Sequence, residues 1–520
     1  MTERASEADE RVRSAELIAA TCLATDLGMG FPLEHGLHAT LVTMRLVDLL
    51  DVDPETASHT YHVALLMYSG CTTEADVTGE IFQGGRTANL TPVQFGSPVE
   101  VLPGLLRAVP TPGASPVRRA YELVRRLPRA ARHRKPHFSA LCEVASMLSE
   151  RLGLPPALRD MFLFLTERWD GKGVLGRARG DEIPLPLRLV HVARDAAYQR
   201  LLGGDERAVE TIRRRAGRAF DPDIAEAFVD RAPEILAAAD VPGSAWDAVL
   251  AAEPRPWLTL EGPGIDRALA GMGDFADLAS PVLAGHSRGV AALATAAAEV
   301  LGLPPEDVRR IGRAGHVHDL GRAAVDPRIW PKPAALTADE WEQVRLHPYH
   351  TERLLHRSPF LAPLAAVACA HHERLDGSGY HRGETAMTLP PAARLLGAAD
   401  AFHAMTESRA HRPAMPREAA AETLEGEARA GRLDARMVAA VVEAAGMPAP
   451  KVERPAGLTE REVEVVALLA RGLQTKQVAR RLGISFKTAD RHIQNAYRKM
   501  GVSTRAAATL FAMEHGLLSL

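Results

Sequence analysis

The sequence predicts an all-α protein made of two related helical units and a small C-terminal helical domain. Ala, Leu, Arg and Glu dominate, aromatic residues make up 5% of the chain, and alternating β-branched runs are nearly absent. The segments RGVAALATAAAEVLGL (288–303) and REVEVVALLARGL (461–473) carry apolar residues at helical spacing. Good helix formers occupy their remaining positions. Helices joined by loops are therefore expected throughout.

The composition excludes several classes of protein. The 520 residues carry 62 Lys and Arg against 65 Asp and Glu, so the whole chain is not a basic nucleic-acid binder. Its four cysteines form no C-x-x-C pair, which argues against a disulfide framework or a cysteine zinc site. No apolar run approaches the ~18 residues of a membrane span, and the N-terminus is charged, unlike a signal peptide. A cytoplasmic protein without a membrane partner is expected.

Proline-containing seams divide the chain into units 1–245, 255–448 and 457–520. One seam lies at 240–257, and the proline-rich stretch 444–457 has the character of an interdomain linker. A third stretch, 91–116, is rich in Pro, Gly and Ser and is expected to be a long loop inside the first unit.

The first two units look like copies of one another. Segment 34–55 aligns without gaps on 285–306, an offset of 251 residues. Farther along, TERWDGKG (166–173) matches HERLDGSG (372–379), and the helix that follows each turn also matches. Similar Ala- and Leu-rich helices arise by chance, but a repeated D-G-x-G turn in the same order favours duplication.

Histidines and aspartates cluster in the second unit. Two adjacent histidines and an adjacent His-Asp pair on helices cannot all face solvent, and unpaired polar groups are costly in a core. Imidazole and carboxylate together bind divalent metals, and a shared carboxylate can place two ions ~3.5–4 Å apart. The alternative, hydrogen-bonded core or surface histidines, suits His356, His381 and His411. The candidate metal ligands are His286, His318, Asp319, His347, His371, His372 and Asp400.

Residues 285–415 resemble the HD-GYP branch of the HD phosphohydrolases. The matching motifs are GHSRGVA, VHDLGR, KPAALTADEWEQVRLHP, HHERLDGSGYHRG and AADAFHAMTESRAHRPA. The resemblance implies that His286, His318, Asp319 and Asp400 are the ligands common to HD domains, with Asp319 as the bridge. It implies that His347, His371 and His372 hold a second metal.

That resemblance also implies an activity and its residues. Members of the group hydrolyse cyclic di-GMP, with two divalent ions such as Fe or Mn assisting attack at phosphorus. Asp319 and Arg322 are the expected catalytic residues. The expected substrate contacts are Arg322, Asp376, Gly379 and Tyr380.

The second unit departs from the family pattern at four positions. Arg322 replaces the usual Lys. Its planar guanidinium keeps the positive charge of the Lys ammonium and can still hold a phosphate oxygen. His381 replaces the Pro of Gly-Tyr-Pro, Val282 stands where some relatives place a Glu for a third metal, and His403 replaces a second Asp. Two functions follow: a phosphodiesterase of cyclic di-GMP or a related nucleotide, or a transcription factor that senses nucleotide and metal without turnover.

The first unit lacks most of these donors. The offset of 251 aligns His318 and Asp319 with Met67 and Tyr68, while His286 keeps a counterpart in His35. When the two units are aligned on their D-G-x-G turns, His371 and His372 match Leu165 and Thr166, and Asp400 matches Asp195. We therefore expect a degenerate unit without a metal site. Whether His133 or His137 matches His347 stays open, as do sensing, dimerisation and structural support as roles.

The C-terminal module has a different charge. Residues 457–520 carry 10 Lys and Arg against 5 Asp and Glu, which is typical of a phosphate-binding face. Glycines divide it into four short helices. Helices 474–482 and 485–499, joined at Gly483-Ile484, form a predicted helix-turn-helix in which Ser485 caps the second helix.

This module resembles the LuxR-type DNA-binding domain along its whole length. Its second helix fits a major groove, and a homodimer on a two-fold site is expected because one such domain contacts little DNA. Asp490 stands where related proteins frequently have a basic residue. The expected DNA-binding residues are Lys476, Lys487, Thr488, Arg491, His492, Asn495, Arg498 and Lys499.

Overall fold

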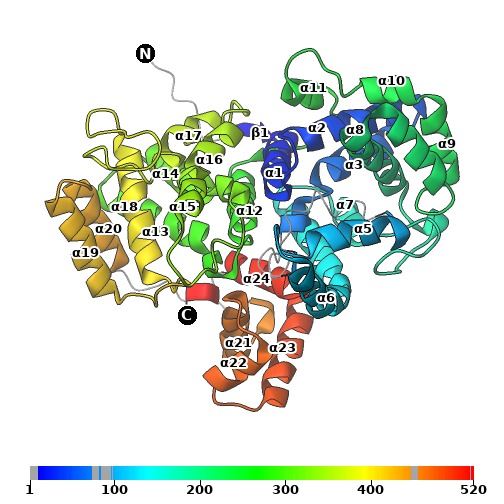
Figure 1. Ribbon diagram of the computed structural model, residues 1–520. Helices are drawn as coiled ribbons and strands as arrows, with labels where there is room; N and C mark the ends of the chain where they lie inside the picture. The colour runs from blue at the N-terminus through cyan, green and yellow to red at the C-terminus, as the bar shows by residue number, and fades with distance from the viewer. Residues whose placement is uncertain are drawn as a thin grey trace, which may run out of the picture. The chain divides into compact units, whose positions relative to one another are not determined.

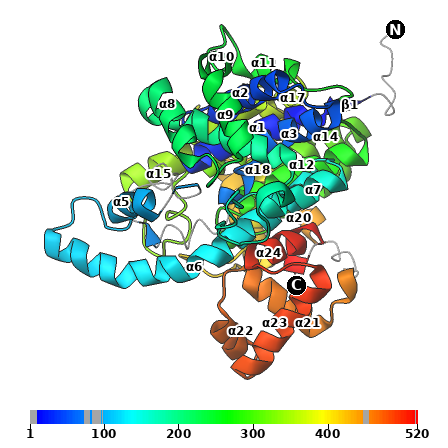
Figure 2. The ribbon, with the colours of Figure 1, turned by 90° about the vertical axis from the view of Figure 1, so that its right-hand side faces the viewer.

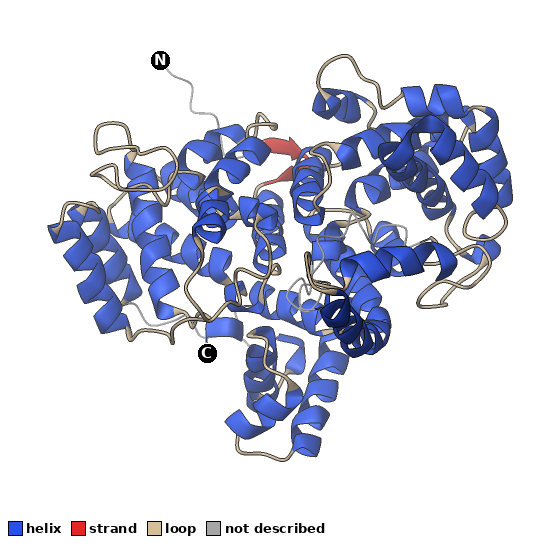
Figure 3. Cartoon of the chain, viewed as in Figure 1, coloured by secondary structure: helices blue, strands red, loops and turns tan. Residues whose placement is uncertain are grey.

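Helices form nearly all of the regular structure, as predicted (Figure 3). The computed structural model describes residues 10–72, 81–82, 95–96, 98–446, 455–515 and 517–519. In these ranges the two strands, β1 (Arg11–Arg13) and β2 (Thr259–Glu261), form one antiparallel pair. The chain divides into two compact units, the first extending to Gly264 and the second running from Ile265 to Leu520. No helix in the described ranges is long and apolar enough to cross a membrane.

The first unit surrounds a core of long helices. Helices α2 and α3 pack against α8, and α1 lies against both. The long α6 is drawn in cyan in Figure 2. The helices are α1 (Ser14–Met29), α2 (His35–Leu49), α3 (Pro54–Leu66), η1 (Ser69–Thr72), α5 (Pro98–Ala108), α6 (Pro116–Arg151), α7 (Pro156–Met161), η4 (Phe162–Phe164), η5 (Gly180–Glu182), α8 (Leu185–Arg215), α9 (Pro222–Asp230), α10 (Ala232–Ala237) and α11 (Ala245–Ala251).

The first unit extends past the predicted boundary at residue 245. Helix α11 buries Trp246 and Val249, and the Tyr61 hydroxyl donates a hydrogen bond to the Val249 carbonyl at 3.0 Å. Strand β2 then pairs with β1. The Pro and Gly residues of this seam suggested a break, but its apolar side chains pack into the first unit.

The predicted loop 91–116 contains a helix instead. Helix α5 occupies Pro98–Ala108, while 83–94 and residue 97 lie outside the described residues. Pro98 is its first residue, where a helix needs no N–H donor, so this proline permits helix formation. Pro103 lies inside the helix, and Ala108 at its end is buried.

The second unit contains the histidine-rich segment and the C-terminal module (Figure 1). Helix α13 is central and packs against α14, α18 and α20. The helices before residue 446 are α12 (Pro263–Asp277), η6 (Pro281–Leu283), α13 (His286–Val300), α14 (Pro305–Val317), η7 (Leu320–Ala324), α15 (Ala338–Arg345), α16 (His347–Leu355), α17 (Ala362–Ala368), α18 (Pro391–Thr406), α19 (Arg417–Arg429) and α20 (Ala435–Ala445).

Helix boundaries repeat between the two units at the predicted offset. Helices α2 and α13 begin 251 residues apart and end 251 residues apart, and α3 and α14 do the same. The residue before α2, Glu34, and its equivalent Gly285 are both left-handed, with φ of 76° and 81°. The agreement supports a duplicated scaffold.

In each unit, a buried aspartate accepts a backbone hydrogen bond at the N-terminus of the equivalent helix. Asp26 accepts a hydrogen bond from the Gly36 N–H at 3.0 Å, and Asp277 accepts one from the Ser287 N–H at 2.9 Å. Burial, which outweighs these hydrogen bonds, raises the pKa of both carboxyls to about 7. The two units therefore share local interactions as well as helices.

The C-terminal module has the predicted helix-turn-helix. Its elements are η8 (Pro455–Gly457), α21 (Glu460–Ala470), α22 (Thr475–Arg481), α23 (Phe486–Met500), α24 (Arg505–Glu514) and η9 (Leu517–Ser519). Ser485 caps α23 by accepting from the Thr488 N–H, and Thr459 forms a capping box with Glu462 at α21. Val478, Ala489 and Ile493 lie in its core. Most of the predicted linker 444–457 lies outside the described residues.

Candidate metal centre and helix-turn-helix surface

The predicted ligands come from five places in the second unit and meet in its interior. His286 begins α13, His318 and Asp319 follow α14, and His347 begins α16. The His371-His372 pair follows α17, and Asp400 lies within α18. All are buried at 4% exposure or less except His372, whose side chain is 15% exposed.

Asp319 lies at the middle of this cluster. Its Oδ1 is 3.0 Å from His347 Nε2 and 3.6 Å from His371 Nε2. Its Oδ2 is 3.0 Å from His318 Nε2 and 3.4 Å from His286 Nε2. Each oxygen of one carboxylate thus faces two imidazole nitrogens, the arrangement of a bridge between two ions.

Asp400 closes one side of the cluster. Its Oδ1 lies 3.1 Å from His286 Nε2 and 3.8 Å from His318 Nε2, and its Oδ2 lies 3.6 Å from His372 Nδ1. Asp400 therefore adds possible metal-ligand oxygens next to the imidazoles that face Asp319 Oδ2.

The orientation of the imidazoles fits a bound cation. His347 and His371 donate their Nδ1 protons to the carbonyls of Val344 at 2.5 Å and Ala368 at 2.6 Å. Their Nε2 lone pairs then face each other at 3.3 Å with no proton between them. His318 Nε2 and both Asp319 oxygens are buried without hydrogen-bond geometry. A metal ion would satisfy these groups together.

The charges in the cluster oppose one another. Burial alone would lower the pKa of His318, but the carboxylates of Asp319 and Asp400 raise it to about 9. Burial lowers the pKa of His347 to about 4 despite Asp319. Burial would raise the pKa of Asp319, but Arg322 and His318 hold it well below its usual range. The protein therefore stabilises an ionised carboxylate among imidazoles.

Arg322 lies on the bridging carboxylate. Its Nη1 is 2.6 Å from Asp319 Oδ2, and its guanidinium carbon is 5.3 Å from the Trp330 ring centroid. It is 5% exposed. The structure brings this predicted catalytic and substrate-binding residue to the cluster, in contact with Asp319.

The three predicted loop residues have different surroundings. Tyr380 stacks on His372 with a centroid separation of 4.2 Å. A Cβ at Gly379 would lie 2.5 Å from the Glu373 Cα, so a side chain does not fit there. Asp376 is exposed and accepts from the Ser378 N–H and hydroxyl at 3.0 and 2.6 Å, which shapes the turn. Of the three, the structure brings Tyr380 into direct contact with a candidate ligand.

Sequence reasoning missed a carboxylate beside His286. Glu407 Oε2 lies 2.9 Å from His286 Nδ1, and Arg409 Nη2 lies 2.6 Å from the same oxygen. His403, identified in the sequence as a departure from the family, has its Nδ1 3.3 Å from Glu407 Oε1. The i,i+4 spacing of His403 and Glu407 was a signal that could have linked them.

The structure also identifies the first-unit counterpart of His347. A Cβ at Gly321 would lie 2.1 Å from the His347 carbonyl oxygen, and one at the equivalent Gly70 would lie 2.2 Å from the Leu141 carbonyl oxygen. Leu141 therefore occupies the place of His347. The two earlier histidines of α6, left open by the sequence, are His133 and His137.

The predicted DNA-binding residues lie on α22 and α23. Lys487, Arg491 and Lys499 are exposed, and Lys499 Nζ donates to Glu462 Oε2 at 2.7 Å and to the Gly457 carbonyl at 2.9 Å. Arg498 pairs with Asn495. The remaining three predicted residues are Lys476, which is exposed, and Thr488 and His492, which are half-buried.

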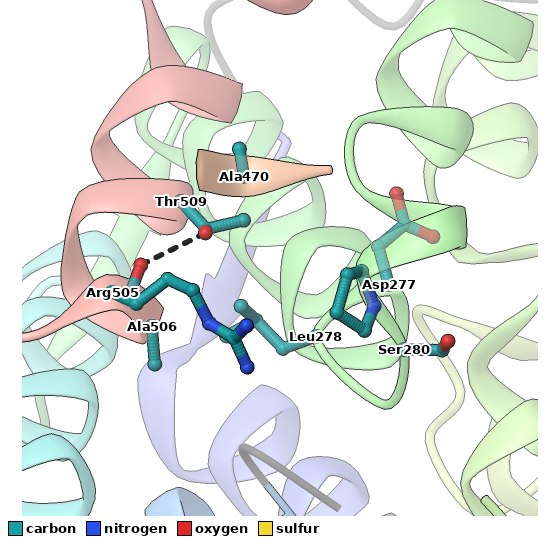
Figure 4. A pocket seen from close by; sticks show the side chains of 8 residues that line it. Asp277, Leu278, Ser280, Ala470, Arg505, Ala506 and Thr509 are labelled. Atoms are coloured by element: carbon teal, nitrogen blue, oxygen red, sulfur yellow. Dashed lines mark hydrogen bonds between the residues drawn. The ribbon is translucent and has the colours of Figure 1, made fainter. Parts of the chain in front are cut away.

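Figure 4 shows a small pocket in the second unit. Thr509 donates a 2.8 Å hydrogen bond to the Arg505 carbonyl at its edge. None of the candidate metal ligands lines it. The lining residues are Asp277, Leu278, Ser280, Pro281, Ala470, Arg505, Ala506 and Thr509.

Comparisons with known proteins match two regions of the chain. Residues 272–437 match the HD domain, and residues 456–512 match the luxR family of bacterial regulatory proteins. A 3'3'-cGAMP-specific phosphodiesterase 3 of Vibrio cholerae is 26% identical over 410 residues, which covers 77% of this chain and 88% of that protein. A match of that length includes part of the first unit.

One further relative and one solved structure are also similar to this chain. The cyclic di-GMP phosphodiesterase response regulator RpfG of Xanthomonas campestris pv. campestris is 39% identical over 148 residues, and the match covers 28% of this chain and 39% of that protein. The crystal structure of a cyclic GMP-AMP specific phosphodiesterase of V. cholerae superposes with a TM-score of 0.57 at 23% identity, covering 84% of this chain and 99% of that one. The chain is therefore an HD-domain protein that also carries a luxR-family helix-turn-helix domain.

Proposed function

We propose that this protein is a metal-dependent phosphodiesterase of a cyclic dinucleotide whose state is coupled to sequence-specific DNA binding. One observation carries the enzymatic part: both oxygens of Asp319 face pairs of imidazole Nε2 atoms at 3.0–3.6 Å. A carboxylate between two imidazole groups is suited to a dinuclear site.

The proposed ligands form two sets. His286, His318 and Asp400 share the Oδ2 side of Asp319, and His347 and His371 share its Oδ1 side, with His372 alongside. When bound, two divalent ions would polarise the phosphoryl oxygens and lower the pKa of water for attack at phosphorus. The identity of the ions, Fe, Mn or similar, is left to measurement.

Residues of the chain supply the remaining functions at this site. Arg322 places a guanidinium beside the bridging carboxylate, where its fork can also hold a phosphate oxygen of the substrate. Tyr380 fixes the ring plane of His372 by stacking. The carbonyls of Gly315, Val344 and Ala368 orient three imidazoles so that Nε2 faces the carboxylates.

Two relatives suggest the substrate class. Their names specify 3'3'-cGAMP and cyclic di-GMP, which are both cyclic dinucleotides. The relative with the longer match is the cGAMP enzyme, so 3'3'-cGAMP belongs in the test beside cyclic di-GMP.

Hydrolysis by the full-length protein tests the enzymatic part. The protein loaded with Mn²⁺ should convert one of the two dinucleotides to the linear form, and Asp319→Ala should lose at least ~10³-fold of the rate because the bridge is gone. Tyr68→Phe, at the equivalent position of the first unit, should hydrolyse at the wild-type rate. Tight nucleotide binding without hydrolysis would instead support a nucleotide-sensing transcription factor.

The DNA-binding part predicts a difference between two cations of α23. Arg491 and Lys499 are both exposed, but Lys499 forms an ion pair with Glu462. On a 30-base-pair duplex, Arg491→Ala should reduce the salt dependence of binding by about one counterion. Lys499→Ala should reduce it less, and equal losses would contradict the assigned face.

The proposed assembly is a cytoplasmic homodimer on a two-fold DNA site, since a single helix-turn-helix domain buries little DNA surface. Sedimentation of the protein with and without DNA checks this, and a monomer in both conditions would contradict it.

A further inference from the structure

Three imidazoles of the candidate centre are oriented in the same way. His318, His347 and His371 donate Nδ1 protons to carbonyls three residues earlier, at 2.7, 2.5 and 2.6 Å. Those carbonyls belong to the last turns of α14, α15 and α17, where helix carbonyls have no partner within the helix. Each Nε2 is thereby turned toward Asp319.

His286 cannot use this arrangement. It is the first residue of α13, and the unpaired groups at a helix N-terminus are N–H donors. Its Nδ1 meets a side chain instead, Glu407 Oε2 at 2.9 Å. Its Nε2 points the other way, 3.1 Å from Asp400 and 3.4 Å from Asp319.

Glu407 is itself held in place. Arg409 donates to Oε2 at 2.6 Å, and His403 Nδ1 lies 3.3 Å from Oε1. A Cβ at Gly289 would lie 1.8 Å from His403 Nε2, so the glycine of α13 makes room for this imidazole. The Glu407 side chain is 19% exposed.

We infer that Glu407 is a positioning residue: by accepting the Nδ1 proton of His286 it fixes the tautomer whose Nε2 lone pair faces the metal position. This inference rests on the proposed metal centre. Carboxylates that orient a ligating histidine in this way commonly contribute 10–100-fold to metal affinity.

The same three side chains do not make a good ligand set of their own. His286, His403 and Glu407 could bring three donor atoms within 4.8 Å of one another. Arg409 Nη2, however, lies 3.2 Å from His286 Nδ1 and 2.6 Å from Glu407 Oε2. A permanent positive charge at that place opposes a cation, so hydrogen bonding is the better explanation.

Metal affinity of the full-length protein tests the inference. The metal-free protein is titrated with Mn²⁺ against a competing chelator, and its melting temperature is measured without metal. Glu407→Ala and the size-matched Glu407→Met should bind Mn²⁺ about 10–100-fold more weakly. Glu407→Gln keeps an acceptor oxygen and should lie closer to wild type. Glu425→Ala, which removes an exposed carboxylate of α19, is the control and should bind as wild type does.

The outcomes separate the inference from the proposed function. Wild-type protein that binds no Mn²⁺ would reject the metal centre itself. Wild-type affinity in Glu407→Met, or equal losses in the Met and Gln variants, would overturn the positioning role alone. Loss of one ion per chain with unchanged affinity for the rest would show that Glu407 is a ligand and would also overturn it. If the Ala variant does not fold, the Met variant with an unchanged metal-free melting temperature decides.

Discussion

Different groups lie beside the equivalent buried positions of the two units. In the second unit, buried carboxylates face imidazole Nε2 atoms that could bind an exchangeable ion together with them. In the first unit, arginines lie beside the aromatic ring and the aspartate at the matching positions. Both arrangements can hold positive charge in a buried polar site. The guanidinium is part of the chain and cannot leave, whereas an ion bound by imidazoles and carboxylates can exchange.

Tyr68 of the first unit stands where Asp319 stands in the second. The guanidinium of Arg194 lies 3.7 Å from the Tyr68 ring centroid and donates to the Ala64 carbonyl at 2.6 Å. Burial, helped by the charge of Arg194, lowers the pKa of His35 to about 3, so this retained imidazole is neutral.

Asp195 keeps the carboxylate that corresponds to Asp400. Arg215 Nη1 lies 2.5 Å from its Oδ2, and both side chains are about 5% exposed. A guanidinium that belongs to the chain neutralises this carboxylate without a metal. The two units thus differ in what lies beside the equivalent carboxylate: a buried arginine in the first unit and imidazoles in the second.

Metal content should show the largest contrast between the units. Asp319→Ala removes the shared carboxylate and should reduce the bound ions from two per chain to none by plasma mass spectrometry. Tyr68→Phe should leave the metal content unchanged, because an aromatic ring and the neighbouring guanidinium do not bind a metal ion. Ions lost from the Tyr68 variant would break the comparison.

Arg215→Ala should destabilise the first unit. Removing one partner of a buried ion pair leaves Asp195 uncompensated and costs about 3–5 kcal/mol of unfolding free energy. Calorimetry should show a lower transition for the first unit with unchanged metal content. Arg213→Ala, at an exposed position of the same helix, serves as the control and should change little.

Chelation should act on the second unit alone. A ligand held at 100 times its Kd stabilises the folded state by about 2.7 kcal/mol, so EDTA should lower the melting temperature of that unit by roughly 5–10 °C. The first-unit transition should stay in place. A shift of both transitions would show that the first unit also depends on metal.

Asp26→Asn should show the smallest effect. Burial raises the pKa of the Asp26 carboxyl to about 7, above that of the unfolded chain, so its protonated form stabilises the fold at low pH. That stability is lost as pH rises from about 4 through 7, amounting to about 2 kcal/mol between pH 5 and 7. The Asn variant stays neutral, and unfolding of the first unit should lose this dependence. An unchanged slope would contradict the assignment.

Much of the fold could be predicted because its signals are local. Helical periodicity predicted the fold class, the D-G-x-G turns predicted the repeat, and Ser485 caps the helix that the sequence assigned to it. The paired strands could not be predicted, because three residues near the start join three residues near 260 and neither segment has a strand pattern of its own. Helix α5 was missed because its prolines suggested a loop.

The site was predictable as a set of donors but not as a geometry. Adjacent His-Asp and His-His pairs indicate metal binding, and the structure brings all seven residues together. Glu407 lies 121 residues after His286 and follows the end of α18, so no spacing rule relates it to that histidine. Arg194 and Arg215 were likewise invisible, because arginines are common in this sequence and only the fold shows which of them are buried.

Anomalous X-ray diffraction from crystals of the full-length protein at the absorption edge of the bound metal tests the contrast between the units most directly. We predict two peaks ~3.5–4 Å apart beside Asp319 and none beside Tyr68. No peak at Asp319, or a peak next to His35, would contradict it.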